Sequence, residues 1–346
     1  MIHVGPGRGA IVCLPPKTES AASSTSSEHV FFRQLRMGGG MKGVKVRGWA
    51  QCKLSSVALM GANFEKEFLR RGDAPLQGGK RLNGIVAQNS AEQPLVTVVT
   101  AIYNGQPYVA GCLESVLRQE YPNIEHIVLD GGSSDGTIDV LRQYDDRLAL
   151  WRSEPDRGIY DAWNKALREA RGKWVCFLGV DDEFLPGAVS AYMALAAKNS
   201  QAEYLSSKVR VVHASGYERT IGHPWTWKKF SKSMCTAHVG SMHRRSLFDR
   251  LGTYNISYPI VADYELLLRA RRELNTAYMP VTTVMMRAGG VSSTRRSLEE
   301  AARAKVAAGG RSKLLTTMEL QIANAKFALR SLRYGLGTIM ARKWTR

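Results

Sequence analysis

Short apolar runs alternate with amphipathic segments between residues 94 and 186. Each run is rich in β-branched residues and ends in acidic or glycine-rich positions, as expected for strands buried on both faces of a parallel sheet. The intervening segments place apolar residues at helical spacing. The pattern predicts an α/β fold with a mostly parallel sheet flanked by helices. We expect strands at 95–101, 124–130, 148–152, 174–179, 204–213 and 277–287, and helices at 106–119, 135–144, 158–170, 244–251 and 260–272.

The segments on either side of this region have different sequence patterns. Residues 1–93 show weak periodicity and include the polar stretch 20–27 and a glycine run at 38–40, so we expect a poorly ordered extension or a translation start placed too early. Met37, Met41 and Met60 are the alternative starts. From Lys313 onward, apolar residues fall on one helical face beside basic ones, which predicts a basic amphipathic helix. The apolar positions are Leu314, Met318, Ile322, Ala325, Leu329, Leu332, Leu336 and Met340. The expected organisation is therefore an extension at 1–93, an α/β domain at 94–290 and a helical tail at 291–346.

The charge of the chain bears on its partners. The formal net charge is +18, and most of the excess lies in the two flanks. A nucleic-acid partner is excluded, because no recognised module and no basic stripe with interleaved aromatic residues is present. An anionic membrane surface fits the C-terminal helix better, with packing of that helix on the domain as the alternative.

The five cysteines form no close pair, and Cys112 and Cys176 lie inside apolar segments. They are typical of reduced core thiols, which indicates a cytoplasmic protein. The chain has no uninterrupted apolar run of 18 residues and no signal-peptide layout at its beginning. Together with the basic tail, this predicts a cytoplasmic enzyme held peripherally on the inner face of the cell membrane.

Acidic residues follow the predicted strands. Asp130 ends one strand and is followed by two glycines, which suits an acceptor for the base or ribose of a nucleotide; a plain strand-turn-helix joint capped by Asp135 is the alternative. Asp181 and Asp182 follow another strand, and paired carboxylates call for a divalent cation unless they form a solvated turn. Asp263 opens an apolar helix as a general base or as an acid that favours the helix dipole.

Other enzyme classes lack their signatures here. A dehydrogenase needs Gly-x-Gly-x-x-Gly after the first strand, and a P-loop NTPase needs its own glycine-rich motif. A nucleotidyltransferase would carry a glycine-rich, basic signature at 100–105, which is absent. His238 and His243 suggest a zinc site with Asp263, but a third histidine or a thiolate at suitable spacing is missing.

Four motifs in order resemble the family 2 glycosyltransferases of the GT-A, Rossmann-like fold over roughly residues 94–290. They are Val98–Asn104, Asp130–Thr137, Phe177–Asp182 and Ala262–Glu265. Two further stretches, Ser153–Lys165 and His238 with Arg244–Phe248, are similar to a subgroup that makes colanic-acid-type exopolysaccharides and lipopolysaccharides.

The resemblance implies a role for each matching residue. Tyr103 would stack on the base, Asp156 and Arg157 would close over the nucleotide, and Asp263 would be the catalytic base. The implied nucleotide-binding set is Thr100, Tyr103, Asn104, Asp130, Asp135, Asp156 and Arg157; Asp181 and Asp182 would hold Mg²⁺ or Mn²⁺; and Asp161, Asn164 and His238 would contact the acceptor or donor sugar.

The implied activity is inverting transfer of a sugar from a UDP- or GDP-sugar to a carbohydrate or lipid-linked acceptor in cell-surface polysaccharide synthesis. One position departs from the family pattern. The metal motif is usually Asp-x-Asp, and its first acid is Gly179 here. The alternative is therefore a catalytically degenerate GT-A protein that binds nucleotide-sugars or acts as a scaffold.

Overall fold

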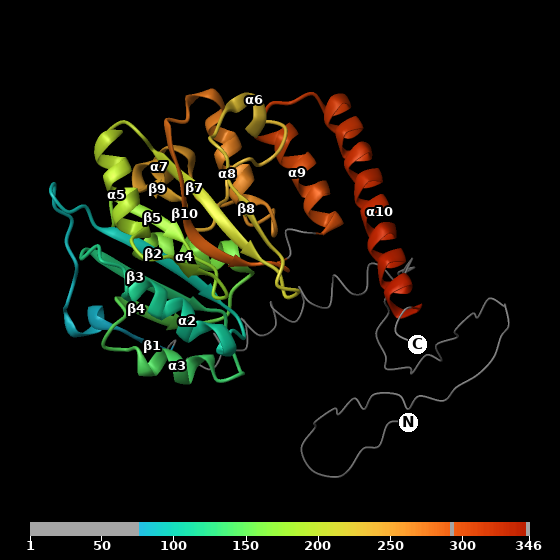
Figure 1. The fold of residues 1–346 in the computed structure, drawn as a ribbon. Helices are drawn as coiled ribbons and strands as arrows, with labels where there is room; N and C mark the ends of the chain where they lie inside the picture. The colour runs from blue at the N-terminus through green and yellow to red at the C-terminus, as the bar shows by residue number, and fades with distance from the viewer. Residues whose placement is uncertain (1–75, 291–293, 344–346) are drawn as a thin grey trace, which may run out of the picture. The chain divides into compact units, whose positions relative to one another are not determined.

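Figure 1 shows a computed structural model of the chain, which describes residues 76–290 and 294–343, with side chains up to residue 328. The expectations for residues 1–75 lie outside the described residues. They concern the polar stretch, the glycine run, Cys13, Cys52 and the alternative starts Met37, Met41 and Met60.

A ten-stranded sheet forms the centre of the described region, in the order β1-β4-β3-β2-β5-β9-β7-β10-β6, with β8 beside β7. Strands β4, β3, β2 and β5 are parallel, as is β7 with β10, whereas β9 runs antiparallel to both of its neighbours. The predicted α/β fold is thus confirmed, with a mixed sheet. The strands are β1 (Leu76–Gly78), β2 (Val96–Ile102), β3 (Ile124–Asp130), β4 (Leu150–Ser153), β5 (Trp174–Phe177), β6 (Glu183–Phe184), β7 (Tyr204–Val212), β8 (Glu218–Ile221), β9 (Met242–Arg244) and β10 (Thr276–Arg287).

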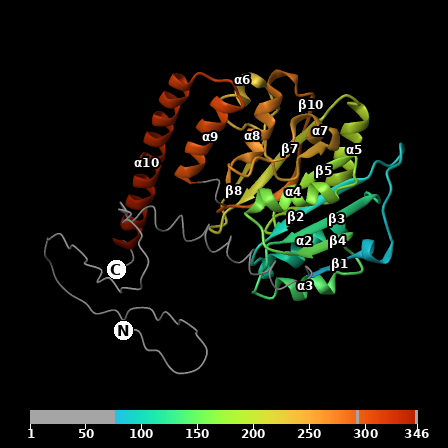
Figure 2. The same ribbon diagram turned by 180° about the vertical axis from the view of Figure 1, so that it is seen from behind.

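Helices cover both faces of the sheet, as the two opposite views show (Figures 1 and 2). Successive residues of a strand point to opposite faces, so β2 sends Val99 toward α4 and α8, and Val98 toward α2 and α5. The helices are η1 (Lys80–Asn83), α2 (Gln106–Leu117), α3 (Thr137–Gln143), α4 (Ile159–Glu169), α5 (Ala188–Lys198), α6 (Trp227–Phe230), α7 (Arg245–Leu251), α8 (Ala262–Ala270), η2 (Arg271–Glu273), α9 (Arg295–Ala307) and α10 (Lys313–Lys343).

The parallel register brings the predicted site loops to one edge of the sheet. Ile102 at the end of β2 lies opposite Asp130 at the end of β3, and Asp130 lies opposite Ser153 at the end of β4. β5 ends beside them, at Phe177. Loops that are far apart in the sequence therefore leave the sheet together, at the edge where open α/β sheets bind ligands.

The ordered part of the fold begins earlier than residue 94. β1 pairs antiparallel with β4, and Arg81 of η1, whose side chain is 8% exposed, forms a salt bridge with the buried Glu125 of β3. The same glutamate also accepts hydrogen bonds from the backbone N–H of Arg171, at 2.7 Å, and of Gly172. The expected boundary at 94 is therefore too late, because residues 76–83 carry part of the sheet and the cation that neutralises a core carboxylate.

We predict that Arg81→Ala lowers the free energy of unfolding by about 3–5 kcal/mol, because it leaves the Glu125 carboxylate buried without its cation. Urea unfolding of the full chain measures the change. The control is Arg142→Ala, which removes the exposed pair with Asp139 and should cost under about 1 kcal/mol. Equal, small losses in both variants would show that η1 contributes little to the fold.

The C-terminal helix α10 presents an apolar stripe to solvent. Leu314, Met318 and Ile322 are all more than half exposed, and Ala325 is exposed as well. Glu319 of α10 forms ion pairs with Lys305 and Arg311. The predicted helix is present, and the described part of its apolar face does not pack on the domain. The predicted apolar positions Leu329, Leu332, Leu336 and Met340 lie beyond the described side chains.

Among the described helices, none is long and apolar enough to cross a membrane.

Candidate active site

An exposed aromatic ring and a carboxylate meet at the carboxyl edge of the sheet. Tyr103 follows β2 with 69% of its surface exposed. A Cβ built on Gly131, which follows β3, would lie 2.7 Å from Asp156 Oδ2 and 3.4 Å from Tyr103 Cδ2. The absence of a side chain at Gly131 therefore leaves room for Asp156 and Tyr103 beside its backbone. Burial raises the pKa of Asp156, and a hydrogen bond from the Gly158 N–H opposes that shift.

Asp130 lies at the end of β3, where hydrogen bonds from the following loop and from β4 hold its carboxylate. Its side chain is buried, and Oδ2 accepts hydrogen bonds from the N–H groups of Gly132 (3.1 Å) and Ser133 (2.9 Å) and from Ser153 Oγ (2.6 Å). Ser133 Oγ bonds the other oxygen. Three of these four bonds fall on Oδ2 and hold the loop that follows β3. The predicted contact of Asp130 with the base or ribose of a nucleotide stays a prediction.

Asn104 and Asp135 also hold loops together. Asn104 has φ of 50°, and its Oδ1 accepts the Ser134 N–H at 3.0 Å. Asp135 accepts hydrogen bonds from Thr137 and, at 3.0 Å, from the N–H of Gln106 at the start of α2. The bond from Thr137 is the main cause that lowers the pKa of Asp135. Asp135 therefore joins the beginning of α3 to the beginning of α2, and its predicted contact with the nucleotide stays a prediction.

Two more predicted binding residues form hydrogen bonds with other parts of the domain. Thr100 is fully buried, and its hydroxyl pairs with His126 Nε2 at 3.0 Å. Asn164 joins α4 to the 252–258 loop: its Nδ2 donates to Tyr254 O at 2.8 Å, and its Oδ1 accepts the Tyr254 N–H at 2.9 Å. Both side chains join separate segments of the domain through these bonds. Their predicted contacts with the nucleotide and the sugar stay predictions.

His238 lies in an aromatic cluster under the same region. Its ring stacks on Phe177 with the centroids 5.6 Å apart and lies 5.2 Å from the Trp163 ring. Burial lowers the pKa of His238 to about 3, so the ring is neutral. Both ring nitrogens are buried without a hydrogen-bond partner among the described residues. His238 as a whole is partly exposed, and its predicted contact with a sugar stays a prediction.

Asp181 and Asp182 follow β5 as predicted. Asp182 is buried, and its Oδ1 accepts the N–H of Arg287 at the end of β10, at 3.1 Å. Burial, with the neighbouring Asp181 charge, raises the pKa of Asp182 to about 7. Asp181 is partly exposed. A Cβ on Gly179 would lie 2.6 Å from Asp182 Oδ2 and 3.2 Å from Asp181 Oδ1, so both carboxylates gather around this glycine.

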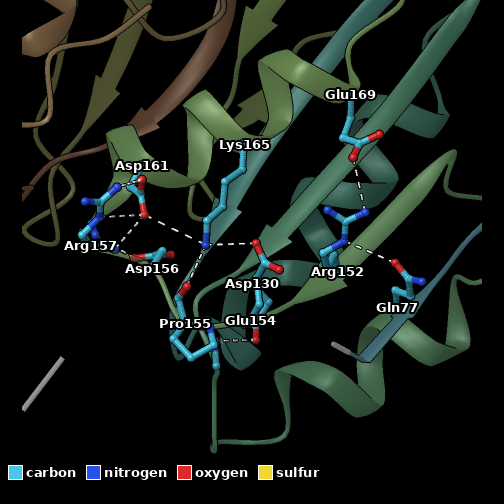
Figure 3. A network of polar contacts seen from close by, with 12 residues as sticks. Gln77, Asp130, Arg152, Glu154, Pro155, Asp156, Arg157, Asp161, Lys165 and Glu169 are labelled. Carbon is cyan, nitrogen blue, oxygen red and sulfur yellow. Dashed lines mark hydrogen bonds and ion pairs between the residues drawn. The ribbon is translucent and has the colours of Figure 1, made fainter. Parts of the chain in front are cut away.

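The stretch from Glu154 to Lys165 forms one network of charges (Figure 3). Asp161 accepts hydrogen bonds from the backbone N–H of Arg157 at 3.1 Å and from its guanidinium at 3.0 Å. Burial acts to raise the pKa of Asp161, but these bonds lower it overall. Lys165 donates to Pro155 O at 2.7 Å and pairs with Glu154 at 3.0 Å. Asp161 thus positions Arg157, and its predicted contact with a sugar stays a prediction.

Asp263 lies in the first turn of α8 and contacts the first turn of α4. Its Oδ1 accepts the Tyr160 hydroxyl at 3.0 Å. Burial raises the pKa of Asp263, while hydrogen bonds from the Tyr264 N–H and from Tyr160 oppose the shift. A carboxylate with a raised pKa, held on a rigid helix, has the properties of a general base.

Sequence reasoning missed Tyr160, Ser153 and Arg287. Tyr160 stands in the stretch that carried the resemblance, yet nothing in a single sequence pairs it with a residue a hundred positions later. Ser153 bonds Asp130 only because β4 lies beside β3. Arg287 reaches Asp182 through the antiparallel pairing of β10 with β6.

A cavity of about 400 Å³ opens at the opposite edge of the sheet, around the beginning of β3. Lys80, Tyr121 and Arg147 are among its lining residues. None of the predicted site residues lines it, so the cavity has no part in the candidate active site.

Comparisons with known proteins identify the family. Residues 97–252 match Glycosyl transferase family 2. An uncharacterized glycosyltransferase of Mycobacterium tuberculosis is 36% identical over 183 residues, which cover 51% of this chain and 69% of that protein. A PGL/p-HBAD biosynthesis glycosyltransferase of Mycobacterium bovis is 28% identical over 208 residues, 58% of this chain and 80% of that protein.

Solved structures share the fold. TarS of S. aureus, in complex with UDP-GlcNAc, has a TM-score of 0.52 at 17% identity and covers 65% of this chain and 70% of its own. The mannosyltransferase PcManGT from Pyrobaculum calidifontis, in complex with GDP-Man and Mn²⁺, has a TM-score of 0.51 at 18% identity, over 82% of this chain and 85% of its own. The chain belongs to glycosyl transferase family 2, and its fold is GT-A.

Proposed function

We propose that this chain transfers a sugar from a UDP- or GDP-sugar to a hydroxyl of a carbohydrate or lipid-linked acceptor, with inversion, in the synthesis of a cell-surface glycan. The contact between α4 and α8 carries the proposal. The loop before α4 holds Asp156 beside Tyr103, and one turn later Tyr160 bonds Asp263. A nucleotide-binding group and a candidate base are thus tied to the same end of one helix.

The nucleotide would lie on the carboxyl edge of the sheet. The exposed ring of Tyr103 suits stacking on a base, and Asp156, whose Oδ1 is fixed by the Gly158 N–H, suits a hydrogen bond to the nucleoside. Arg157, held by Asp161, supplies positive charge beside it. TarS with UDP-GlcNAc and PcManGT with GDP-Man support both kinds of donor.

A divalent cation fits this site only together with the donor. Among the described residues, no group of three or more His, Cys, Asp or Glu side chains could hold a metal ion. Mg²⁺ and Mn²⁺ commonly bind through one or two carboxylates and the substrate phosphates, and the pair at 181 and 182 meets that need. Asp181, the more exposed of the two, would be the main protein ligand. When bound, the ion would stabilise the negative charge of the departing diphosphate.

The chemical step is a direct displacement. Asp263 accepts the proton of the acceptor hydroxyl as that oxygen attacks the anomeric carbon of the donor sugar. The bond from this carbon to the diphosphate breaks at the same time, and its electron pair leaves with the nucleoside diphosphate. Attack from the face opposite the leaving group inverts the configuration at the anomeric carbon.

A labelled-donor assay tests the proposal. The full chain is incubated with radiolabelled UDP- and GDP-sugars, Mn²⁺ and carbohydrate or lipid-linked acceptors, and the acceptor fraction is counted. The proposal predicts label in the acceptor with one of the donors. Tight donor binding without transfer would instead favour the degenerate, nucleotide-sugar-binding alternative.

We further propose that α10 rests on the anionic inner surface of the cell membrane. Its exposed apolar stripe could enter the interface, while basic residues of the tail contact lipid headgroups for about 1 kcal/mol each. Replacing Leu314, Met318 and Ile322 together with Gln should reduce binding to phosphatidylserine vesicles by at least about tenfold, measured by co-sedimentation at low salt.

The stripe variant should keep its activity on soluble acceptor analogues, because the three side chains are exposed. The control replaces Leu82 and Val281, which are exposed elsewhere, with Gln. Equal vesicle binding by the wild type, the stripe variant and the control would remove α10 as the membrane contact.

A further inference from the structure

Tyr160 is the side chain that reaches Asp263 across the junction of α4 and α8. Its hydroxyl lies 3.0 Å from Asp263 Oδ1 and 2.9 Å from the backbone oxygen of Ile260. We propose that Tyr160 is the positioning residue of the base: it holds one oxygen of the Asp263 carboxylate, so that the other oxygen is presented to the acceptor hydroxyl. The role in transfer rests on the proposed function, whereas the hydrogen bond to Asp263 does not.

The surroundings of Tyr160 leave it little freedom to turn. Its side chain is 5% exposed, with ring centroids 5.1 Å from Trp163 and 5.4 Å from Tyr254. Asn164, one turn further along α4, bonds both backbone groups of Tyr254. Because α4 is anchored on both sides of the ring, the hydroxyl is held where Asp263 needs it, which is how a second layer of residues fixes a catalytic group.

The Tyr160 hydroxyl has one proton to donate and two acceptors within reach, Asp263 Oδ1 and Ile260 O. This arrangement suits a base that is ionised before the reaction and protonated after it. While Asp263 is ionised, the stronger bond is the one to the carboxylate, because a charged acceptor strengthens the hydrogen bond. Once Asp263 has taken the proton of the acceptor sugar, the Tyr160 hydroxyl can donate to Ile260 O instead. The buried hydroxyl then keeps a partner in both states of the base.

Among the side chains around Asp263, Tyr160 has the main influence on the ionisation of its carboxyl group. Tyr254 of the 252–258 loop and Tyr204 of β7 face it as neutral phenols, each with a pKa raised by burial first and by the Asp263 charge after it. Glu300 of α9 binds the Ile260 N–H at 2.9 Å and pairs with Arg296. Removing the Tyr160 hydroxyl should therefore destabilise the ionised form of Asp263 with little compensation.

The test is Tyr160→Phe in the full chain. Carbon-13 NMR of aspartate-labelled protein should show the pKa of Asp263 rising by about one unit, because a hydrogen bond to the charged form is lost. In the transfer assay, the acid limb of the kcat/KM profile should move to higher pH by the same amount, while nucleotide affinity stays unchanged. An unshifted Asp263 resonance would overturn the proposal, whether or not the protein transfers sugar.

Tyr254→Phe is the matched control. Tyr254 is equally buried in the same aromatic cluster, but its hydroxyl has no hydrogen-bond partner among the described residues. The Tyr254→Phe substitution should leave both the Asp263 titration and the pH profile of transfer unchanged. Tyr160→Phe should also have no further effect on turnover in an Asp263→Asn background, since residues that act through one another are not additive. Additive losses in the double variant, or equal shifts from both tyrosines, would mean that Tyr160 acts only through packing.

Discussion

Asp263→Asn should reduce sugar transfer by at least about a hundredfold while leaving donor binding intact. Asparagine keeps the size of the side chain and can still bond the Tyr160 hydroxyl, but it cannot accept the proton of the acceptor hydroxyl. Initial rates of transfer, together with calorimetric titration of the nucleoside diphosphate, separate the two effects.

The control for this substitution is Asp139→Asn. Asp139 is also an acid in the first turn of a helix, α3, but it is exposed and pairs with Arg142. Near-normal turnover in both variants would show that Asp263 only stabilises the beginning of α8 and is not the catalytic base. Two nearby residues are poor replacements as the base, because Glu265 pairs with Arg269 and the His238 nitrogens are buried.

Chelation should abolish transfer, and Asp181→Asn should lower it by at least about a hundredfold. Metal stabilisation of a leaving diphosphate is worth several kcal/mol, and each 1.36 kcal/mol is a factor of ten in rate. Asp182→Asn should be milder, because Asp182 is buried and already bonded to the Arg287 N–H. EDTA inactivation, reversal by Mn²⁺ and the rates of both variants measure these effects.

Full activity in EDTA would contradict the metal prediction. It would show that the glycine at 179, where the family usually has an acid, marks a metal-independent site. If Asp182→Asn lowered the transfer rate more than Asp181→Asn, the buried carboxylate of Asp182 would be the main protein ligand of the metal.

Strands with strong apolar patterns could be predicted from the sequence almost to the residue. The expected strand at 124–130 is β3 without change, and the expected helix at 158–170 is α4 to within a residue at either end. These segments owe their structure to local periodicity. β1 and β9, three residues each, carry no periodicity and exist because neighbouring strands offer them hydrogen bonds.

The residue types at the ends of the predicted strands indicated the edge of the sheet where the candidate site lies. They did not indicate which of these side chains face outward. The hydrogen bonds that Ser133 and Ser153 donate to the Asp130 carboxylate could not be predicted, because a single sequence does not show which segments lie beside the end of β3. The side chain of Thr100 lies on a buried face of β2, and its hydroxyl pairs with His126 of the neighbouring strand β3. Such roles depend on contacts between distant segments, which only the folded chain provides.

The central claim is direct displacement of a nucleoside diphosphate by an acceptor hydroxyl at the carboxyl edge of the sheet. Proton NMR of the anomeric linkage in the product tests it most directly, with the full chain, α-linked UDP- and GDP-sugars and a panel of carbohydrate and lipid-linked acceptors. The account predicts a β-linked product from an α-linked donor. An α-linked product, or no transfer by a folded chain that still binds these donors, would contradict it.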